Sequence, residues 1–198
     1  MKNFKNMRDY SHEELVELIL NLTEEQILDL SANYGGYPVL FRMALDERIS
    51  HIPFIQTGAA IIIENENKEI LLQERTDRNQ WGLPGGCQDL GEDLRFTAVR
   101  EAKEETGLIL NPDELELIDT LSGESRKNSY PNGDIVYNNT SLYVAHVALH
   151  DASNLKGDSE TKRLKFFALE NIPTNLMDID LINTYKKYLS KAQRLVRK

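Results

Sequence analysis

Residues 86 to 108 constrain the fold of this chain more than any other stretch, because both ends of a helix can be located within it. Asp93 is a residue type that caps helix starts, and Gly107 is the type that takes the left-handed position at a helix end. The stretch therefore predicts a loop followed by a short helix that runs to Thr106.

The predicted helix carries three acidic residues on one narrow stripe, since residues three and four apart are neighbours on a helix: Glu101, Glu104 and Glu105. Like charges at this spacing repel each other, so a cation should compensate them, and carboxylate oxygens suit Mg²⁺ or Mn²⁺. We therefore expect a metal site. The alternative is a solvent-facing acidic helix on which Arg100 and Lys103 are ordinary surface partners.

The spacing of the whole stretch fits Gly-x5-Glu-x7-Arg-Glu-U-x-Glu-Glu-x-Gly-U, where U is an aliphatic residue. This pattern resembles the Nudix box, and all seven of its fixed residue types are present: Gly86, Glu92, Arg100, Glu101, Glu104, Glu105 and Gly107. From ordinary residue usage, a chance match in a chain of this size is roughly one in a million. Ala102 departs from the pattern, which prefers Ile, Leu or Val there, but a small residue still packs a helix against a sheet.

The resemblance to the Nudix hydrolases covers about residues 55 to 175. It implies an α/β fold, an α/β/α sandwich around a mixed sheet in which the box forms a loop and a helix. The implied activity is hydrolysis of a nucleoside diphosphate linked to some moiety X, by attack of water at a phosphorus of the pyrophosphate bridge. Because the pyrophosphate is anionic and repels this attack, divalent cations that neutralise its oxygens supply most of what the reaction needs.

The resemblance also implies roles for individual residues. The expected metal ligands are three box glutamates and one carboxylate in a later loop: Glu101, Glu104, Glu105 and Glu160. Families with this box take either a box glutamate or a later carboxylate as proton acceptor, so the catalytic candidates are Glu101, Glu104, Arg100 and Glu160. Arg100 would orient Glu92, while Gly86 and Gly107 shape the loop and the helix end. Glu160 is either the base, a fourth ligand or a plain surface acid, and Glu124 is a further candidate.

The first fifty residues predict a helical extension, which we separate from a catalytic domain over residues 51–198. Ser11-x-x-Glu14 and Thr23-x-x-Gln26 both match the capping-box pattern of helix starts. Pro38 suits the first turn of a third helix that reaches about Arg48. The extension could serve as a dimer surface, a packed addition or a lid over the site, and we favour the first two.

The residues before the box predict a hairpin. A buried strand at 59–63 and a return strand at 70–75 are joined by a polar turn at 65–68. The loop at 81–86 then leads into the box, and its glycines allow the backbone to pass close to a ligand. Trp81 could bind substrate by stacking on a base, although core packing suits an indole better.

The residues after the box alternate strands and loops before a closing helix. Residues 115–121 alternate as a strand would, with Leu115, Leu117 and Leu121 on one side. Asn132-Gly133 is a hairpin signal that leads into a long strand at 135–149, and another strand follows at 164–168. Arg126 and Lys127 lie in a loop that either faces the substrate or forms a solvated tip. Apolar residues from 181 to 196 trace one face of the last helix.

Charge and composition limit the kinds of partner and the cellular location expected for this chain. The formal net charge of −9 argues against a general nucleic-acid binder, because phosphate backbones require a basic footprint. The apolar runs are too short to span a bilayer, and the start does not read as a signal peptide, so we expect a cytoplasmic protein. Cys87 is the single cysteine, which excludes an intrachain disulfide and suits a reducing compartment; it is either passive or reactive.

The leading hypothesis is a Mg²⁺-dependent pyrophosphohydrolase, with Mn²⁺ as a substitute, that acts on a nucleoside diphosphate linked to X, such as ADP-ribose or a nucleotide sugar. One alternative is a (deoxy)nucleoside triphosphate pyrophosphohydrolase that cleans the nucleotide pool, and another is a nucleotide-sensing module without catalysis. Removal of the 5′ pyrophosphate from RNA is disfavoured by the net charge. The segment from about Met43 to Tyr143 resembles a bacterial branch of the family, in which a homodimer is expected, but marks of particular substrate groups are absent. The substrate therefore stays open.

Overall fold

The computed structural model describes residues 53–129, 134–148 and 155–196, together with positions 11, 13, 14, 17, 21 and 23. Most of the predicted extension at 1–50 lies outside these residues, as do the second and third predicted helices and the Asn132-Gly133 turn. The first capping box is described and confirmed. The Oγ of Ser11 accepts a hydrogen bond from the backbone N of Glu14, and the Glu14 carboxylate accepts one from the backbone N of Ser11. The division at residue 50 stays a prediction.

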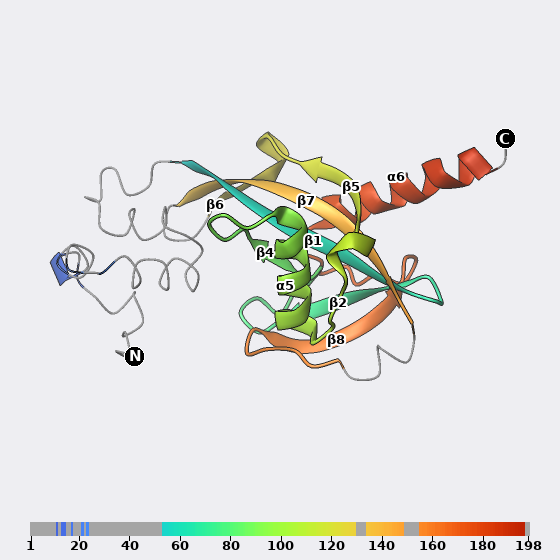
Figure 1. The fold of residues 1–198 in the computed structure, drawn as a ribbon, viewed down its shortest axis with the longest axis horizontal. Coiled ribbons are helices and arrows are strands. Elements are labelled where there is room, and N and C mark those ends of the chain that lie inside the picture. The colour runs from blue at the N-terminus through green and yellow to red at the C-terminus, as the bar shows by residue number, and fades with distance from the viewer. Residues whose placement is uncertain are drawn as a thin grey trace.

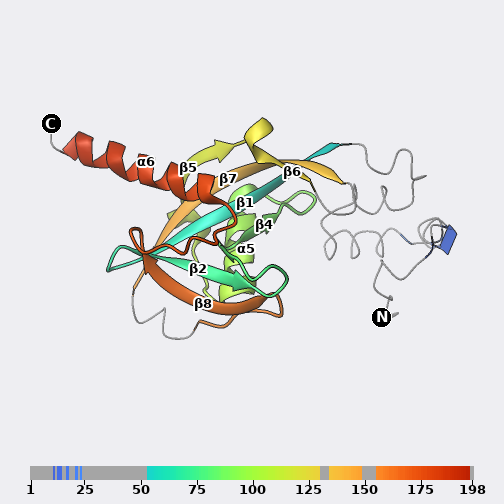
Figure 2. The ribbon, with the colours of Figure 1, turned by 180° about the vertical axis from the view of Figure 1, so that it is seen from behind.

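The described residues form one mixed sheet with a helix on each face (Figures 1 and 2). Its strands are β1 (Phe54–Asn65), β2 (Glu69–Arg75), β3 (Trp81–Gly82), β4 (Gly85–Cys87), β5 (Glu116–Leu121), β6 (Lys127–Ser129), β7 (Ile135–Val147) and β8 (Thr161–Ala168). The helices are α5 (Leu94–Thr106) and α6 (Ile179–Val196), and the 3-10 turns are η2 (Pro112–Glu114) and η3 (Glu124–Arg126). This arrangement confirms the predicted α/β class and the mixed sheet.

The centre of the sheet is a long parallel pair. β1 and β7 are in register from Phe54 opposite Val136 to Asn65 opposite Val147, whereas the other strand pairs are antiparallel. On its other edge, β1 pairs with β2 only at the hairpin end, and with β4 at positions 58 to 60. The predicted hairpin is therefore confirmed, and β4 occupies the space where β1 and β2 diverge.

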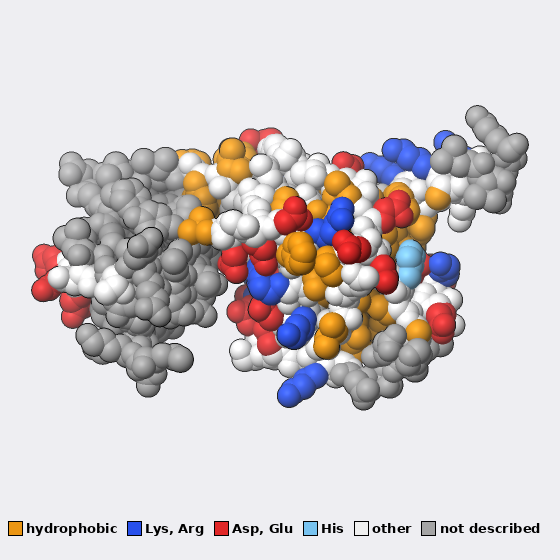
Figure 3. Space-filling view, in the orientation of Figure 1, with side chains coloured by type: hydrophobic (Ala, Val, Ile, Leu, Met, Phe, Trp, Pro, Cys, Tyr) orange, Lys and Arg blue, Asp and Glu red, His pale blue; other side chains and the backbone are white. Residues whose placement is uncertain are grey.

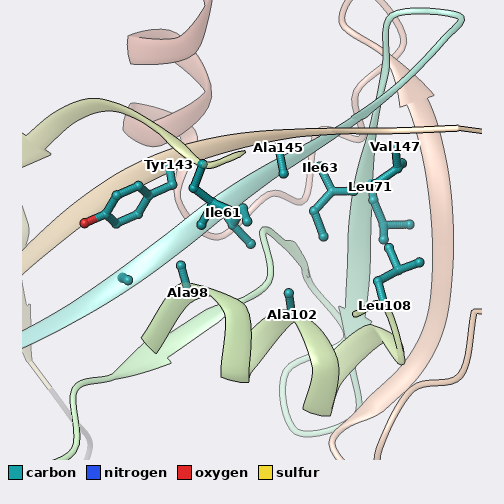
Figure 4. Close-up of a cluster of buried hydrophobic side chains, with 11 residues drawn as sticks. Ile61, Ile63, Leu71, Ala98, Ala102, Leu108, Tyr143, Ala145 and Val147 are labelled. Carbon is teal, nitrogen blue, oxygen red and sulfur yellow. The ribbon is translucent and has the colours of Figure 1, made fainter. Parts of the chain in front are cut away.

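The two faces of β1 follow the two-residue period of a strand and build two cores. Ile61 and Ile63 point toward α5, where they pack with Ala98 and Ala102 (Figure 4), and Ala59 belongs to the same core. The alternate residues of β1, Ala60 and Ile62, belong to a second core. There they pack with residues of β7 and α6: Leu142, Val144, Leu181, Ile182 and Tyr185. Burying each aliphatic side chain of this size contributes about 1.5 to 3 kcal/mol, so the two cores dominate the stability of the sandwich.

The strand after the box differs from its expected alternation. Leu115, Leu117 and Leu121 were expected on one side, but Leu115 packs in the α5 core, Leu121 packs against the α6 core, and half of the surface of Leu117 is exposed. The register of β5 against β7 shifts between Leu117 and Asp119, which is a β-bulge. The alternation therefore differs before and after the bulge: Leu117 pairs with Tyr143 of the α5 core, whereas Leu121 pairs with Thr140 and lies with Ile118 against the α6 core.

No helix in the described part of the chain is long and apolar enough to cross a membrane.

Candidate active site

Helix α5 begins and ends at the residues that its sequence predicts. The Asp93 side chain accepts a hydrogen bond from the backbone N of Arg95, and Gly107 takes the left-handed conformation with φ 77° and ψ −2°. Ala98 and Ala102 are fully buried against the sheet, so the helix lies close to it. This packing directs the acidic stripe toward β4, and acidic side chains with basic ones among them surround the helix on the surface (Figure 3).

Arg100 ties the loop of the box to its helix. Its Nε lies 3.0 Å from Oε1 of Glu92, and one terminal nitrogen donates to both Oε2 of Glu92 and the carbonyl of Cys87. Burial alone would raise the pKa of Glu92, but hydrogen bonds from Arg100 and Thr97 hold it below its ordinary value. Arg100 also donates to Glu101 at 2.8 Å. The arginine therefore fixes the position of a stripe carboxylate relative to the loop.

The three glutamates of the stripe lie in different environments. The side chains of Glu105 and Glu101 are 6% and 14% exposed, whereas that of Glu104 is 54% exposed. Oε2 of Glu105 accepts a hydrogen bond from the backbone N of Gly85 at 2.8 Å. Burial raises the pKa of Glu105 to about 7 and also raises the pKa of Glu101. The cations near these two carboxyls therefore do not offset the cost of burying the ionised forms.

The glycine loop is shaped to receive one of these carboxylates. A Cβ on Gly86 would lie 2.3 Å from Oε1 of Glu101, closer than real Cβ contacts come. Only glycine therefore allows the Glu101 carboxylate to lie against β4. This contact explains the glycine of the box in physical terms.

The carboxylate oxygens of the stripe are suitable ligands for a hard divalent cation, although the three side chains do not converge on one point. Within the described residues, no three Asp, Glu, His or Cys side chains converge as they stand on a point that could hold a metal. Arg100 draws Glu101 and Glu104 toward itself, at 2.8 and 3.4 Å. Two buried carboxyls with raised pKa values and an exposed third beside them are oxygen ligands of the kind that Mg²⁺ and Mn²⁺ prefer.

Arg75 at the end of β2 brings the later acidic loop to the stripe. It forms a 2.6 Å ion pair with Glu160 and lies 3.8 Å from Oε1 of Glu105. Arg75 therefore links Glu160, whose side chain is 60% exposed, to the buried Glu105. Arg75 was not among the site residues predicted from the sequence. A cation at the end of a buried strand, shortly before a glycine loop, is a signal that could have identified it.

A cavity of about 330 Å³ lies on the other side of β4 from the stripe, on the α6 face of the sheet. Its wall combines β1, β7 and the box loop with the segment before α6. Arg75 lines it, as does Arg126, which is 9% exposed and donates to Asp178 at 2.9 Å. The structure therefore places Arg126 at the cavity and excludes the solvated-tip alternative for it.

Burial decides between the alternatives considered for Trp81 and Cys87. Trp81 is 7% exposed and packs edge-on against Phe167, with ring centroids 4.9 Å apart, so the substrate-binding role considered for it is replaced by core packing. Burial raises the pKa of the Cys87 thiol to about 11. A thiol that resists ionisation is a poor nucleophile, which favours the passive alternative for Cys87.

Comparison with known proteins agrees with this geometry. The family model of the NUDIX domain matches residues 55–188. Over 130 residues the chain is 31% identical to an ADP-ribose pyrophosphatase of Methanocaldococcus jannaschii, covering 64% of this chain and 70% of that protein. Over 50 residues it is 52% identical to a putative 8-oxo-dGTP diphosphatase of Bacillus subtilis, covering 25% of this chain and about a third, 34%, of that protein.

Solved structures share the fold. The NUDIX domain of Shewanella oneidensis NrtR, complexed with ADP ribose, matches with a TM-score of 0.54 at 20% identity, over 85% of this chain and 99% of that one. A MutT NUDIX hydrolase from Burkholderia pseudomallei matches with a TM-score of 0.51 at 23% identity, over 66% of this chain and 98% of that one. At these identities the likeness shows the fold alone.

Proposed function

The chain belongs to the Nudix hydrolase family, and from this premise we propose that it is a Mg²⁺-dependent pyrophosphohydrolase of a nucleoside diphosphate linked to X, such as ADP-ribose or a nucleotide sugar. The observation that carries the proposal is the pair of buried glutamates, Glu101 and Glu105, held against the glycines of β4 beside a cavity. The likeness to an ADP-ribose pyrophosphatase supports the X-linked class.

The metal-binding residues in this proposal are the stripe glutamates Glu101, Glu104 and Glu105. A bound Mg²⁺ or Mn²⁺ would neutralise the pyrophosphate oxygens and lower the pKa of a water molecule. Arg100 keeps Glu101 against the loop, and Gly85 holds Glu105 through its backbone N–H. These contacts set the positions of the carboxylates before substrate arrives, which is what transition-state stabilisation requires.

Glu160 is our candidate for the proton acceptor or for a fourth metal ligand. Its ion pair with Arg75, which also contacts Glu105, and its exposure to water support this role. Arg75 lines the cavity while it contacts both acids. A pyrophosphate placed over β4 would therefore meet a guanidinium on one side and the acidic stripe on the other.

The test is turnover of a substrate panel by the purified protein. ADP-ribose, nucleotide sugars, dinucleoside polyphosphates and (deoxy)nucleoside triphosphates are incubated with Mg²⁺, and the products are separated chromatographically. We expect a nucleoside monophosphate and phosphorylated X, and no turnover by the Glu105→Gln variant. Release of pyrophosphate from triphosphates alone would instead indicate the nucleotide-pool function. Binding without any turnover would indicate a sensing module.

We also propose that the protein acts in the cytoplasm as a homodimer with a small-molecule nucleotide as its partner. The predicted helices of residues 1–50 are the natural place for the dimer contact. Light scattering of the full chain and of a chain that lacks residues 1–50 tests this assignment. A monomeric full chain would contradict it.

A further inference from the structure

The floor of the cavity changes character along the sheet. On the α6 face, apolar residues extend along β1 and β7 down to Ala60 and Leu142. The same face then continues with Gly58 beside Thr140 and with Gln56 beside Asn138, and all four line the cavity. The core therefore ends where a floor of hydroxyl and amide groups begins.

The wall of the cavity carries an ion pair whose arginine is buried. Arg126 donates to Asp178 at 2.9 Å and to the hydroxyl of Thr140 at 3.3 Å. Its Nε is buried and has no acceptor among the described residues. A buried donor of this kind requires an acceptor, which a ligand oxygen or an ordered water can supply.

The lining is rich in guanidinium groups. Three arginines, Arg75, Arg78 and Arg126, line the cavity with one carboxylate, that of Asp178. Arg75 and Arg78 both pair with Asp77, Arg75 pairs also with Glu160, and Arg126 pairs with Asp178. The lining therefore offers guanidinium N–H donors to ligand oxygens, while neighbouring carboxylates balance its positive charge.

The chemistry of the lining also separates a sugar from a base. None of the described lining residues is aromatic, so they offer no ring on which a base could stack. The amides of Gln56 and Asn138 both donate and accept hydrogen bonds, and Asp178 accepts them. Hydroxyl groups require this combination, because each is both a donor and an acceptor.

We propose that this cavity binds the X moiety of the substrate as a hydroxyl-rich sugar joined to the pyrophosphate, with Asp178, Arg126 and Asn138 as specificity-determining residues. The inference rests on the proposed hydrolysis of X-linked nucleoside diphosphates. Arg75 marks the point where the sugar meets the pyrophosphate, because it lines the cavity and also lies 3.8 Å from Glu105.

The experiment compares two substrates that differ only in X. ADP-ribose carries a sugar, whereas the methyl ester of ADP keeps the same base, ribose and pyrophosphate with a methyl group as X. We expect the wild-type protein to prefer ADP-ribose in kcat/KM by about tenfold or more, the worth of one or two hydrogen bonds to charged groups. Asp178→Asn should lose most of this preference, while Asp180→Asn, which makes the same charge change two residues away, should keep it.

A second variant guards against misfolding, because Asp178→Asn leaves the buried Arg126 without its ionic partner. Asn138→Leu removes a polar group from the floor and leaves that ion pair intact, and it should lower kcat/KM for ADP-ribose while that for the methyl ester changes less than about twofold. Equal rates of the wild type on both substrates, or equal losses on both in the variants, would overturn the inference and leave the hydrolase function standing. Failure of the wild type on both substrates and on the nucleotide sugars of the panel would instead reject the proposed function.

Discussion

The burial of Glu105 makes a prediction about the stability of the metal-free protein. Its pKa rises from an ordinary 4.5 to about 7, first because of burial and to a lesser extent because of the nearby Glu101 charge. The folded state therefore favours the protonated acid, and folding stability falls as pH rises from about 4.5 through 7. Since a difference of one in pKa is worth about 1.4 kcal/mol, this carboxyl should cost about 2 to 3 kcal/mol between pH 5 and pH 8.

The assay is urea unfolding of wild type and Glu105→Gln in the presence of a chelator at pH 5 and pH 8. Trp81, the single tryptophan, is buried and reports unfolding by its fluorescence. The loss of stability between the two pH values should be smaller in Glu105→Gln than in the wild type by about 2 to 3 kcal/mol. Glu104→Gln makes the same change on the exposed side of the stripe, and it should keep the pH dependence of the wild type.

Addition of Mg²⁺ extends this measurement. A cation bound to the stripe removes the penalty for ionising Glu105, so Mg²⁺ should raise the stability of the wild type more at pH 8 than at pH 5. Glu105→Gln should show a much smaller gain. If Glu105→Gln and the wild type lose the same stability between pH 5 and pH 8 without metal, our account of the buried carboxyl is refuted.

The remaining predictions concern the loop around the stripe. Gly86→Ala should displace the flexible Glu101 carboxylate, so the fold survives while Mg²⁺ affinity, measured by calorimetry, falls about tenfold or more. Gly58→Ala should instead lower the free energy of unfolding by about 2 kcal/mol or more in urea titrations, because its Cβ would lie 2.3 Å from the backbone oxygen of Gly86. Arg100→Lys should lose the two-pronged contact with Glu92, cost about 1 to 3 kcal/mol of stability and lower kcat; unchanged values of both would contradict its positioning role.

The helix of the box could be predicted to the residue because its signals are local. Asp93 caps it, Gly107 ends it, and the stripe follows from the helical period alone. The burial of the strand at 59–63 could also be predicted from the sequence, because an unbroken apolar strand is typically covered on both faces. In each case the information lies within about a dozen neighbouring residues.

The shape of the rest depends on contacts between distant residues. The bulge that puts Leu117 and Leu121 on opposite faces of the sheet arises from the register of β5 against β7, which no local pattern records. Arg126 pairs with Asp178, 52 positions later in the chain, and Arg75 pairs with Glu160, 85 positions later. A sequence shows that such residues are charged, but only the fold shows which of them pair.

The site has the same two parts, one built from local contacts and one built from distant contacts. The residues proposed for metal binding occupy one loop and one helix, while the cavity draws its polar groups from β1, η3, β7 and the segment before α6. β4 separates the two, since Gly85 holds Glu105 on one side and lines the cavity on the other. Substitutions in the cavity can therefore change the preferred X without disturbing the acidic stripe, which is why an intact box predicts the reaction and leaves the substrate to be measured.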